Sequence, residues 1–277
     1  MIRKPSVEGR FYPDTRNAIF QLLHEIEGRT SYADPPGIQG TPIGAILPHA
    51  GHAYSGYQTI PFFRYLIRER EVPDTFIIVN PNHRGTGDDV TLDPHKAWMN
   101  AAGSLSLDQE LAHELPFPFD PGAQENEHAA EVIIPFIQYF FRDVPPKILP
   151  VCMNNQDSNT AIMLGKSLHQ AVVKIGRRVL IIASSDFSHF LSPDEGYKQD
   201  QYVLDKILMK DTRGVEEQVL KHKVTVCGYG PIMTLMAYAA LENEDYQAIL
   251  LARGHSGEVH PSAEVVDYVS VMFHTSG

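Results

Sequence analysis

Residues 178–189 read Arg-Val-Leu-Ile-Ile-Ala-Ser-Ser-Asp-Phe-Ser-His, and this stretch decides the fold class. Its first half, residues 178–183, contains the apolar run 179–183 and has the length expected for a strand buried on both faces. Its second half places a carboxylate and an imidazole directly after that run. In open α/β sheets, ligands bind beyond the carboxyl ends of the strands. The stretch therefore predicts a buried strand that ends at a functional site.

Short apolar runs and helical patterns alternate on both sides of this stretch. Such alternation favours an α/β fold, in which a central, largely parallel or mixed sheet has helices on both faces. Because the sequence contains no internal repeat, residues 1–277 are expected to form a single domain. The expected strands are 43–47, 75–80, 147–152, 178–183, 246–252 and 265–273, the last two paired, and the expected helices are 15–28, 57–68, 128–141, 158–174, 194–209 and 231–241.

Proline and glycine positions define the expected breaks in this pattern. Residues 29–42 are rich in both and predict a linker, and residues 116–126 predict a second loop. Pro135 lies inside the expected helix 128–141, where it predicts either a kink or a late helix start.

Composition excludes several classes of function. The chain has 23 Lys and Arg residues against 34 Asp and Glu residues, a net charge of −11, so nucleic acid is not an expected partner. No apolar run approaches the roughly 20 residues of a membrane span, and no signal peptide is apparent, so we expect a soluble protein without a membrane partner. Only Cys152 and Cys227 are present, which favours the cytoplasm. The 13 histidines direct attention to metals.

Histidines follow two of the expected strands. His49 and His52 lie in the Gly-rich segment after strand 43–47, and His83 comes soon after strand 75–80. If these strands are neighbours, His49 and His83 converge at one edge of the sheet. The sequence therefore predicts a site with at least two imidazoles.

A cysteine and an acidic segment complete the candidate set. Cys227 stands just before the helix expected from Pro231, where a thiol ionises more easily and ligates metals better. His128 lies in the acidic segment 125–131, whose role the sequence leaves undetermined.

Simpler interpretations apply to other residues. Cys152 ends an apolar strand and is expected in the core, and Asp186 has the alternative role of a cap in a polar turn. Ser184 and Ser185 lack the Gly-x-Ser-x-Gly pattern of a serine hydrolase, and no Gly-rich segment completes a nucleotide-binding motif. Five lone histidines are expected to be surface or hydrogen-bonding residues without a functional role: His24, His113, His169, His222 and His274.

The order and spacing of these motifs resemble the Memo family, whose prokaryotic members are also called AmmeMemoRadiSam system protein B. Gly9-Arg10-Phe11-Tyr12-Pro13 and Asp267-Tyr268-Val269-Ser270 are similar to the two ends of that family, so the resemblance covers nearly the whole chain. The family name implies two partners, an Ammecr-type protein and a radical SAM protein. The motifs that carry the resemblance between those ends are Pro48-His49-Ala50-Gly51, Pro81-Asn82-His83, Glu127-His128, residues 184–189 and Cys227-Gly228.

The resemblance also implies a fold and a metal site. Memo proteins are similar in fold to class III extradiol ring-cleaving dioxygenases, whose non-haem iron is held by two histidines and a glutamate. By the motif match, His49 and His83 take the histidine positions and Cys227 takes the glutamate position. His189 corresponds to the acid/base histidine, with Asp186 beside it. The implied cofactor is iron or copper, with zinc as a possible substitute.

Several positions depart from the eukaryotic family pattern. His52 replaces a tyrosine, Ser188 replaces a cysteine, and Tyr229-Gly230 replaces Arg-His beside the implied thiol ligand. The implied cleft for a small-molecule or peptide ligand is bordered by Phe11, Tyr12, His52, Tyr54, Arg84 and His128.

Three functional hypotheses follow from these residues. The first is a metal-dependent redox enzyme with a site made of two histidines and one cysteine, since a thiolate in place of a carboxylate favours softer ions such as copper. The second is a non-catalytic protein that binds a peptide or a partner in the same cleft. The third is a zinc-dependent hydrolase, because two histidines, a cysteine and an open position also form a catalytic zinc site.

Overall fold

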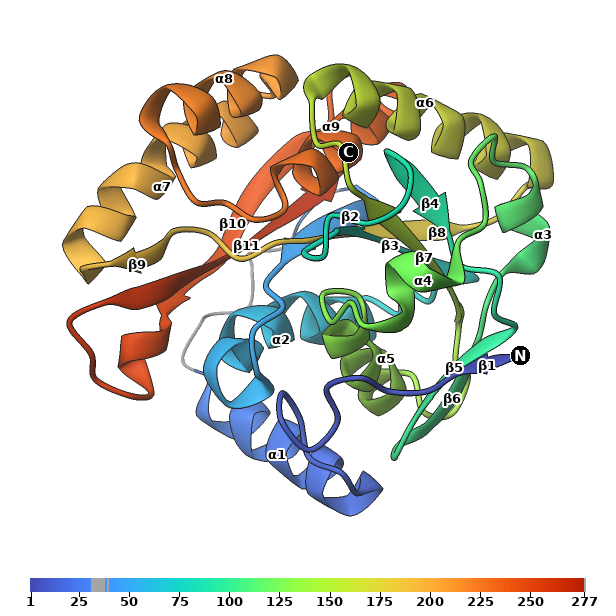
Figure 1. The fold of residues 1–277 in the computed structure, drawn as a ribbon, viewed down its shortest axis with the longest axis horizontal. Coiled ribbons are helices and arrows are strands. Elements are labelled where there is room, and N and C mark those ends of the chain that lie inside the picture. Colours follow the sequence, from blue (N-terminus) through green and yellow to red (C-terminus); the bar gives the residue numbers. More distant parts are fainter. Residues whose placement is uncertain (31–37, 39, 277) are drawn as a thin grey trace.

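A computed structural model describes residues 1–30, 38 and 40–276. The expected linker 29–42 therefore lies largely outside the described residues. The expected α/β class is confirmed: a mixed sheet lies between two layers of helices (Figure 1). Four parallel strands form its centre, in the spatial order β2 (Pro42–Leu47), β8 (Val179–Ser184), β3 (Thr75–Pro81) and β7 (Lys147–Met153).

Antiparallel strands complete both sides of the sheet. Beside β2 lies β11 (Val265–His274), which pairs in turn with β10 (Gln247–His255), as expected for the last two strands. The short strand β9 (His189–Leu191) also pairs with β11. On the far side, β4 (Val90–Leu92) pairs with β7. The sheet is therefore mixed, with its parallel strands at the centre.

One expectation about strand order is wrong. The strands that precede His49 and His83 are not neighbours, because β8 lies between β2 and β3 and pairs with both. Their carboxyl ends still lie at the same edge, since all three strands are parallel. The end of β8 and the residues after it, 184–189, therefore lie at the middle of this edge.

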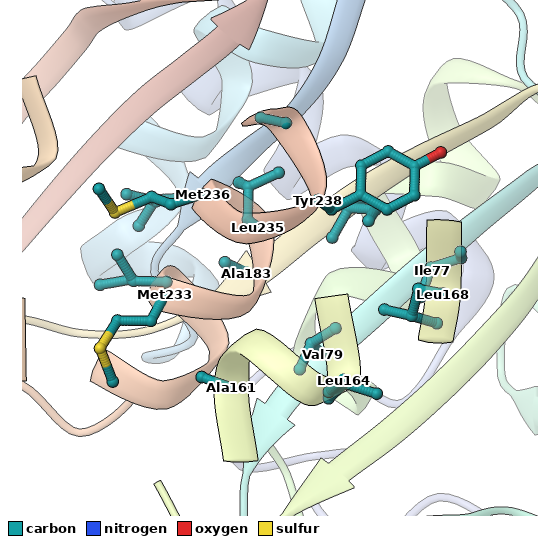
Figure 2. Close-up of a cluster of buried hydrophobic side chains, with 14 of the residues drawn as sticks. Ile77, Val79, Ala161, Leu164, Leu168, Ala183, Met233, Leu235, Met236 and Tyr238 are labelled. Atoms are coloured by element: carbon teal, nitrogen blue, oxygen red, sulfur yellow. The ribbon is translucent and has the colours of Figure 1, made fainter. Parts of the chain in front are cut away.

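Alternate side chains of each central strand enter different cores, as a period of two requires. Ile77 and Val79 of β3 pack with Leu164 and Leu168 of α6 (Ser158–Ile175), as Figure 2 shows. The side chains on the other face of the sheet, such as that of Phe76 of β3, enter the second core. The first core is covered by α3 (Gln109–His113), α6, α7 (Pro193–Leu208), α8 (Thr212–His222) and α9 (Tyr229–Glu242), and the second by α1 (Arg16–Arg29), α2 (His52–Arg68) and α5 (Ile134–Phe140).

One helix begins earlier than the sequence pattern predicted, and another begins late, as one of the two outcomes predicted from Pro135. α2 begins at His52 instead of residue 57, because the Gly-rich segment is already helical. Gly56 lies inside that helix, where an added Cβ would approach Ile26 of α1 to 3.0 Å, so the glycine serves close packing. The expected helix 128–141 starts late, with a 3₁₀ turn at Glu131–Ile133 before α5. Pro135 occupies the first turn of α5, where proline is tolerated.

Several short elements were not predicted. A small second sheet consists of β1 (Ile2–Arg3), β5 (Ala97–Asn100) and β6 (Gly103–Ser106), and strands this short leave almost no periodic signal. The helices α3 and α8 were also missed, and α4 (Pro121–Glu125) lies in the expected loop 116–126. Among the described helices, none is long and apolar enough to cross a membrane.

Candidate metal centre

The ends of two parallel strands and the segment before α9 bring the candidate ligands together. His49 follows β2, His83 follows β3, and Cys227 approaches from the segment before α9. One donor atom from each of these residues lies within 4.8 Å of the other two. The Cys227 Sγ is 3.3 Å from the His49 Nε2. The structure thus brings together the three residues that the resemblance implied as ligands.

Hydrogen bonds fix the tautomer of His49. The Ser184 hydroxyl donates its only proton to the carbonyl of Ala129 at 2.7 Å, so towards His49 it is an acceptor. The His49 Nδ1, 2.9 Å away, must therefore carry the proton and donate it to Ser184. This leaves a lone pair on the His49 Nε2, the atom that faces Cys227. Burial, and then the nearby His128 and His83, hold the pKa of His49 well below its usual value, which keeps the imidazole neutral as metal ligation requires.

Glu127 performs the same function for His83. One carboxylate oxygen lies 3.0 Å from the His83 Nδ1, and the other accepts the His83 backbone N–H at 2.7 Å. Burial alone raises the pKa of Glu127, but hydrogen bonds with His83 and with backbone N–H groups lower it to about 2. The ionised carboxylate therefore holds the proton on Nδ1 and leaves Nε2 free to ligate.

Glu127 also belongs to a second possible ligand group, with His83 and His128. Its Oε1 already accepts the backbone N–H groups of His128 and Ala129, at 2.7 and 2.9 Å, in addition to the His83 ring. Because these donors already occupy Oε1, Glu127 orients the His83 ring and does not act as a ligand. The orienting role of Glu127 was not predicted from the sequence, although the Glu127-His128 motif of the resemblance pointed to its position.

We expect Glu127→Gln to weaken metal binding by roughly 10- to 100-fold, the usual cost of losing a carboxylate that orients a ligating histidine. The amide offers one acceptor oxygen and a nitrogen that repels the neighbouring N–H donors. Competition with a chromophoric chelator measures the affinity. Glu125→Gln, an exposed change at the end of α4, two residues before Glu127, is the matched control, and equal affinities for the two variants would contradict this role.

Burial disfavours the thiolate form of Cys227 in the metal-free protein. The expectation of an easily ionised thiol is wrong for the metal-free protein, because burial and then the charge of Asp186 raise its pKa. The backbone N–H of Asp186 donates to the Cys227 Sγ at 3.2 Å, a contact that stabilises a thiolate only weakly against this burial. Metal binding must therefore displace the thiol proton.

Asp186 anchors the loop that carries His49. Its Oδ1 accepts the backbone N–H of His49 at 2.8 Å, so it joins the ends of β8 and β2. Burial raises the pKa of Asp186 to about 6, against the opposing effect of its hydrogen bond with His49. The alternative role as a cap in its own polar turn is not observed, because the Asp186 side chain accepts from the His49 loop and the N-cap of the next helix, α7, is Ser192.

Two contacts with Thr225 orient the backbone and the ring of His189. Its backbone N–H donates to the Thr225 hydroxyl at 2.7 Å, and its Nδ1 donates to the Thr225 carbonyl at 2.9 Å. A carbonyl only accepts, so the proton lies on Nδ1 and Nε2 is available for proton transfer. Its charge lies near enough to lower the pKa of both His49 and Asp186.

The expected cleft residues divide into two groups. His128 stacks on His83, with ring centroids 4.8 Å apart, and Phe11 lies 4.9 Å from His128 on its other side. Tyr54 and Arg84 are exposed, in α2 and in the loop after β3. These four residues border the centre or stand in the segments beside its ligands.

Tyr12 and His52 were expected in the cleft, and both instead face the core. The Tyr12 hydroxyl donates to Glu131 at 2.8 Å, and His52 is fully buried with its Nε2 2.9 Å from the carbonyl of Val132. Burial lowers the pKa of His52 to about 4. The early start of α2 causes this orientation, because it turns His52 towards Phe136 of α5. Cys152 is fully buried, as expected.

Comparison with known proteins places the chain in a family. A family model described as Memo-like protein matches residues 3–272. The chain belongs to the Memo family. Two Memo relatives are similar over their whole lengths: the MEMO1 family protein PAE0818 of Pyrobaculum aerophilum is 36% identical and covers 99% of each chain, and the MEMO1 family protein of Methanococcoides burtonii is 35% identical and covers 98% of this chain and 99% of its own.

A solved structure shares the Memo fold at low sequence identity. The uncharacterized protein JW3007 from Escherichia coli K12 superposes with a TM-score of 0.51 and 14% identity, over 76% of this chain and 90% of its own. This similarity concerns the fold alone. The family resemblance derived from the motifs is thus confirmed by relatives that match nearly the entire chain.

Proposed function

We propose that this Memo-family protein is a metal-dependent redox protein whose ion is held by His49 Nε2, His83 Nε2 and Cys227 Sγ. The observation that carries the proposal is the common orientation of the two imidazoles. In each ring Nδ1 is engaged, by Ser184 in one and by Glu127 in the other, and the donor atoms of the three residues fall within 4.8 Å of one another. A set of two imidazoles and one thiolate fits a transition metal and does not fit Mg²⁺ or Ca²⁺.

Iron or copper is the proposed native ion, and zinc is a substitute that binds the same donors. When bound, a redox-active ion supplies one-electron chemistry and open coordination positions for dioxygen and an organic substrate. The chain's own residues supply orientation and proton transfer. Ser184 and Glu127 hold the ligating rings, and Asp186 holds the backbone of His49. His189 Nε2, with Nδ1 fixed by Thr225, gives or takes a proton at the rim.

The test separates metal binding from turnover. Protein is purified without oxygen from cells supplied with iron and copper, its metal is counted by mass spectrometry, and oxygen uptake is followed with ascorbate and with a panel of catechols. We expect close to one iron or copper ion per chain and measurable oxygen uptake. A metal-free protein, even after reconstitution, would contradict the proposal and favour the second hypothesis, in which the cleft binds an Ammecr-type or radical SAM partner. Ester hydrolysis by the zinc-bound protein, without oxygen uptake, would favour the third hypothesis, a zinc-dependent hydrolase.

His189→Gln is expected to keep the metal and to lose roughly 100-fold or more of the oxygen uptake, the usual size of an acid/base contribution. Glutamine retains a hydrogen-bonding side chain but cannot exchange a proton near neutral pH. His113→Gln, an exposed histidine on α3, is the matched control. Oxygen uptake at the wild-type rate in His189→Gln would exclude this residue as the acid/base group.

A further inference from the structure

Two buried carboxyl groups lie behind the segment that carries His189. Asp200 is on α7 and Asp267 is on β11, and both are completely buried. Among the described residues, neither oxygen of the Asp267 side chain receives a hydrogen bond from an N–H or a hydroxyl donor. A buried carboxylate without donors is costly, so this pair requires a physical explanation.

Asp200 holds Ser188, the residue that precedes His189. One oxygen of Asp200 accepts the Ser188 backbone N–H at 3.0 Å and the Ser188 hydroxyl at 2.6 Å. The other oxygen lies 3.5 Å from the guanidinium of Arg253. The Asp200 carboxylate is therefore the acceptor that ties residue 188 to α7.

Asp267 holds the same segment through its backbone. Its N–H donates to the carbonyl of Ser188 at 2.8 Å, and its carbonyl accepts the N–H of Phe187 at 2.9 Å. Ser188 is thus fixed from two sides, by the side chain of Asp200 and by the main chain of Asp267. Its successor His189 then enters β9, where it pairs with Val266.

A proton shared with Asp200 gives the Asp267 carboxyl group a hydrogen-bond partner. Asp200 and Asp267 are close enough for a side-chain hydrogen bond, and such a bond between two carboxyl groups exists only when one is protonated. Burial first, and then the charge of Asp200, raise the pKa of Asp267 to about 8. A protonated Asp267 donates to Asp200, which keeps the charge that Ser188 and Arg253 require.

Other charged and titratable groups also face the pair. From β10, Arg253 opposes the rise in the pKa of Asp267, and Glu258, in the 3₁₀ turn Ser256–Glu258, adds to it. Tyr197 of α7 lies under the guanidinium of Arg253, at 3.8 Å from its ring centroid. His255 lies behind Tyr197, with ring centroids 6.5 Å apart. None of these groups belongs to the candidate metal centre.

We infer that Asp200 and Asp267 share one proton and that the protonated pair positions Ser188 and His189 at the rim of the candidate metal centre. Loss of the proton places two negative charges side by side in a buried site and weakens the attachment of Ser188. Asp200 and Asp267 are therefore positioning residues. The inference rests on the proposed function only where it gives His189 a role in proton transfer.

The sign of the pH dependence follows from the raised pKa. A group that is protonated more readily in the folded than in the unfolded state stabilises the fold at low pH, and this contribution is lost as the pH rises through the folded-state value. As the pH rises from 6 to 9, the hydrogen bonds that hold residues 187–189 are expected to weaken. In Asp267→Asn the amide group donates a hydrogen bond to Asp200 at every pH. The attachment of residues 187–189 is therefore expected to be independent of pH in this variant.

Nuclear magnetic resonance on the full chain, as purified and after metal removal, tests the inference. Carboxyl ¹³C signals report the titration of Asp267, and hydrogen exchange, corrected for its intrinsic pH dependence, reports the protection of the Ser188 N–H. We expect Asp267 to remain protonated at pH 6.5 and Ser188 protection to fall about tenfold or more by pH 9. In Asp267→Asn the protection is expected to change less than about twofold, and Glu264→Gln, an exposed change before β11, is expected to behave like the wild type.

Two results would overturn the inference. Ionisation of Asp267 in the ordinary range of aspartate, seen in the wild type without any variant, would exclude the shared proton. Ser188 protection that is independent of pH in the wild type would exclude the positioning role. Because both measurements are made without bound metal as well as with it, they are independent of whether the metal centre is redox-active.

Discussion

Cys227→Ser is expected to lower the affinity for Fe(II) or Cu(I) by more than about 100-fold. This loss is larger than the roughly 10- to 100-fold expected when a residue that only orients a ligand is removed. The change removes the only anionic donor among the three ligands, and a serine hydroxyl is a hard, weak ligand for such ions. Ser184 and Glu127 hold the two imidazoles at Nδ1 independently of Cys227, so the rings keep their places while the charge is lost. Competition with a chelator and the metal content per chain measure the effect.

The second cysteine provides the matched control. Cys152 is fully buried on β7 and belongs to neither candidate ligand group. Cys152→Ala is therefore expected to keep wild-type metal affinity at some cost in stability. Wild-type affinity in Cys227→Ser, or equal losses in the two variants, would show that the thiol of Cys227 is not a ligand.

Arg3→Met is expected to destabilise the fold by about 3 to 5 kcal/mol, the cost of breaking a buried ion pair on one side. Arg3 is only 3% exposed, and its guanidinium lies 2.8 Å from a carboxylate oxygen of Glu131. The same guanidinium donates to the carbonyls of Gln124 and Glu127 and lies 4.0 Å from the Trp98 ring centroid. Its loss leaves a buried carboxylate without its cation and removes one donor each from the carbonyls of Gln124 and Glu127.

Urea unfolding measures this loss, with Lys4→Met as the exposed neighbouring control. The double variant Arg3→Met with Glu131→Gln is expected to recover part of the stability, because it removes the unpaired charge. Glu131 keeps backbone donors from Ser6 and Val7, so the glutamine remains hydrogen-bonded. A change of less than about 1 kcal/mol in Arg3→Met would contradict the importance of the pair.

The fold class was predictable because the central strands are long, apolar and bounded by turns. The positions of β3, β7 and β8 follow directly from such runs. Strand order was not predictable, because a crossover helix reaches either neighbouring or more distant positions in a sheet, and β8 separates β2 from β3. The small sheet was missed because strands of 2 to 4 residues carry no period.

The convergence of His49 and His83 was predictable, since polar residues after parallel strands meet at one edge, and Cys227 was indicated by its place before a helix and by the family resemblance. Their supporting residues were not predictable. The roles of Ser184 and Glu127 depend on which atoms the loops bring within 3 Å of His49 and His83, and no local pattern encodes that distance. His52 was misplaced for a related reason, because its orientation depends on where α2 begins.

X-ray absorption spectroscopy of the iron- or copper-loaded protein tests the proposed metal centre most directly. We predict one sulfur scatterer at about 2.3 Å, the usual metal–thiolate distance, together with imidazole nitrogens at about 2.0 to 2.1 Å. The sulfur contribution should vanish in Cys227→Ser and remain in Cys152→Ala. A first shell made only of nitrogen and oxygen in the wild-type protein would contradict a centre built from His49, His83 and Cys227.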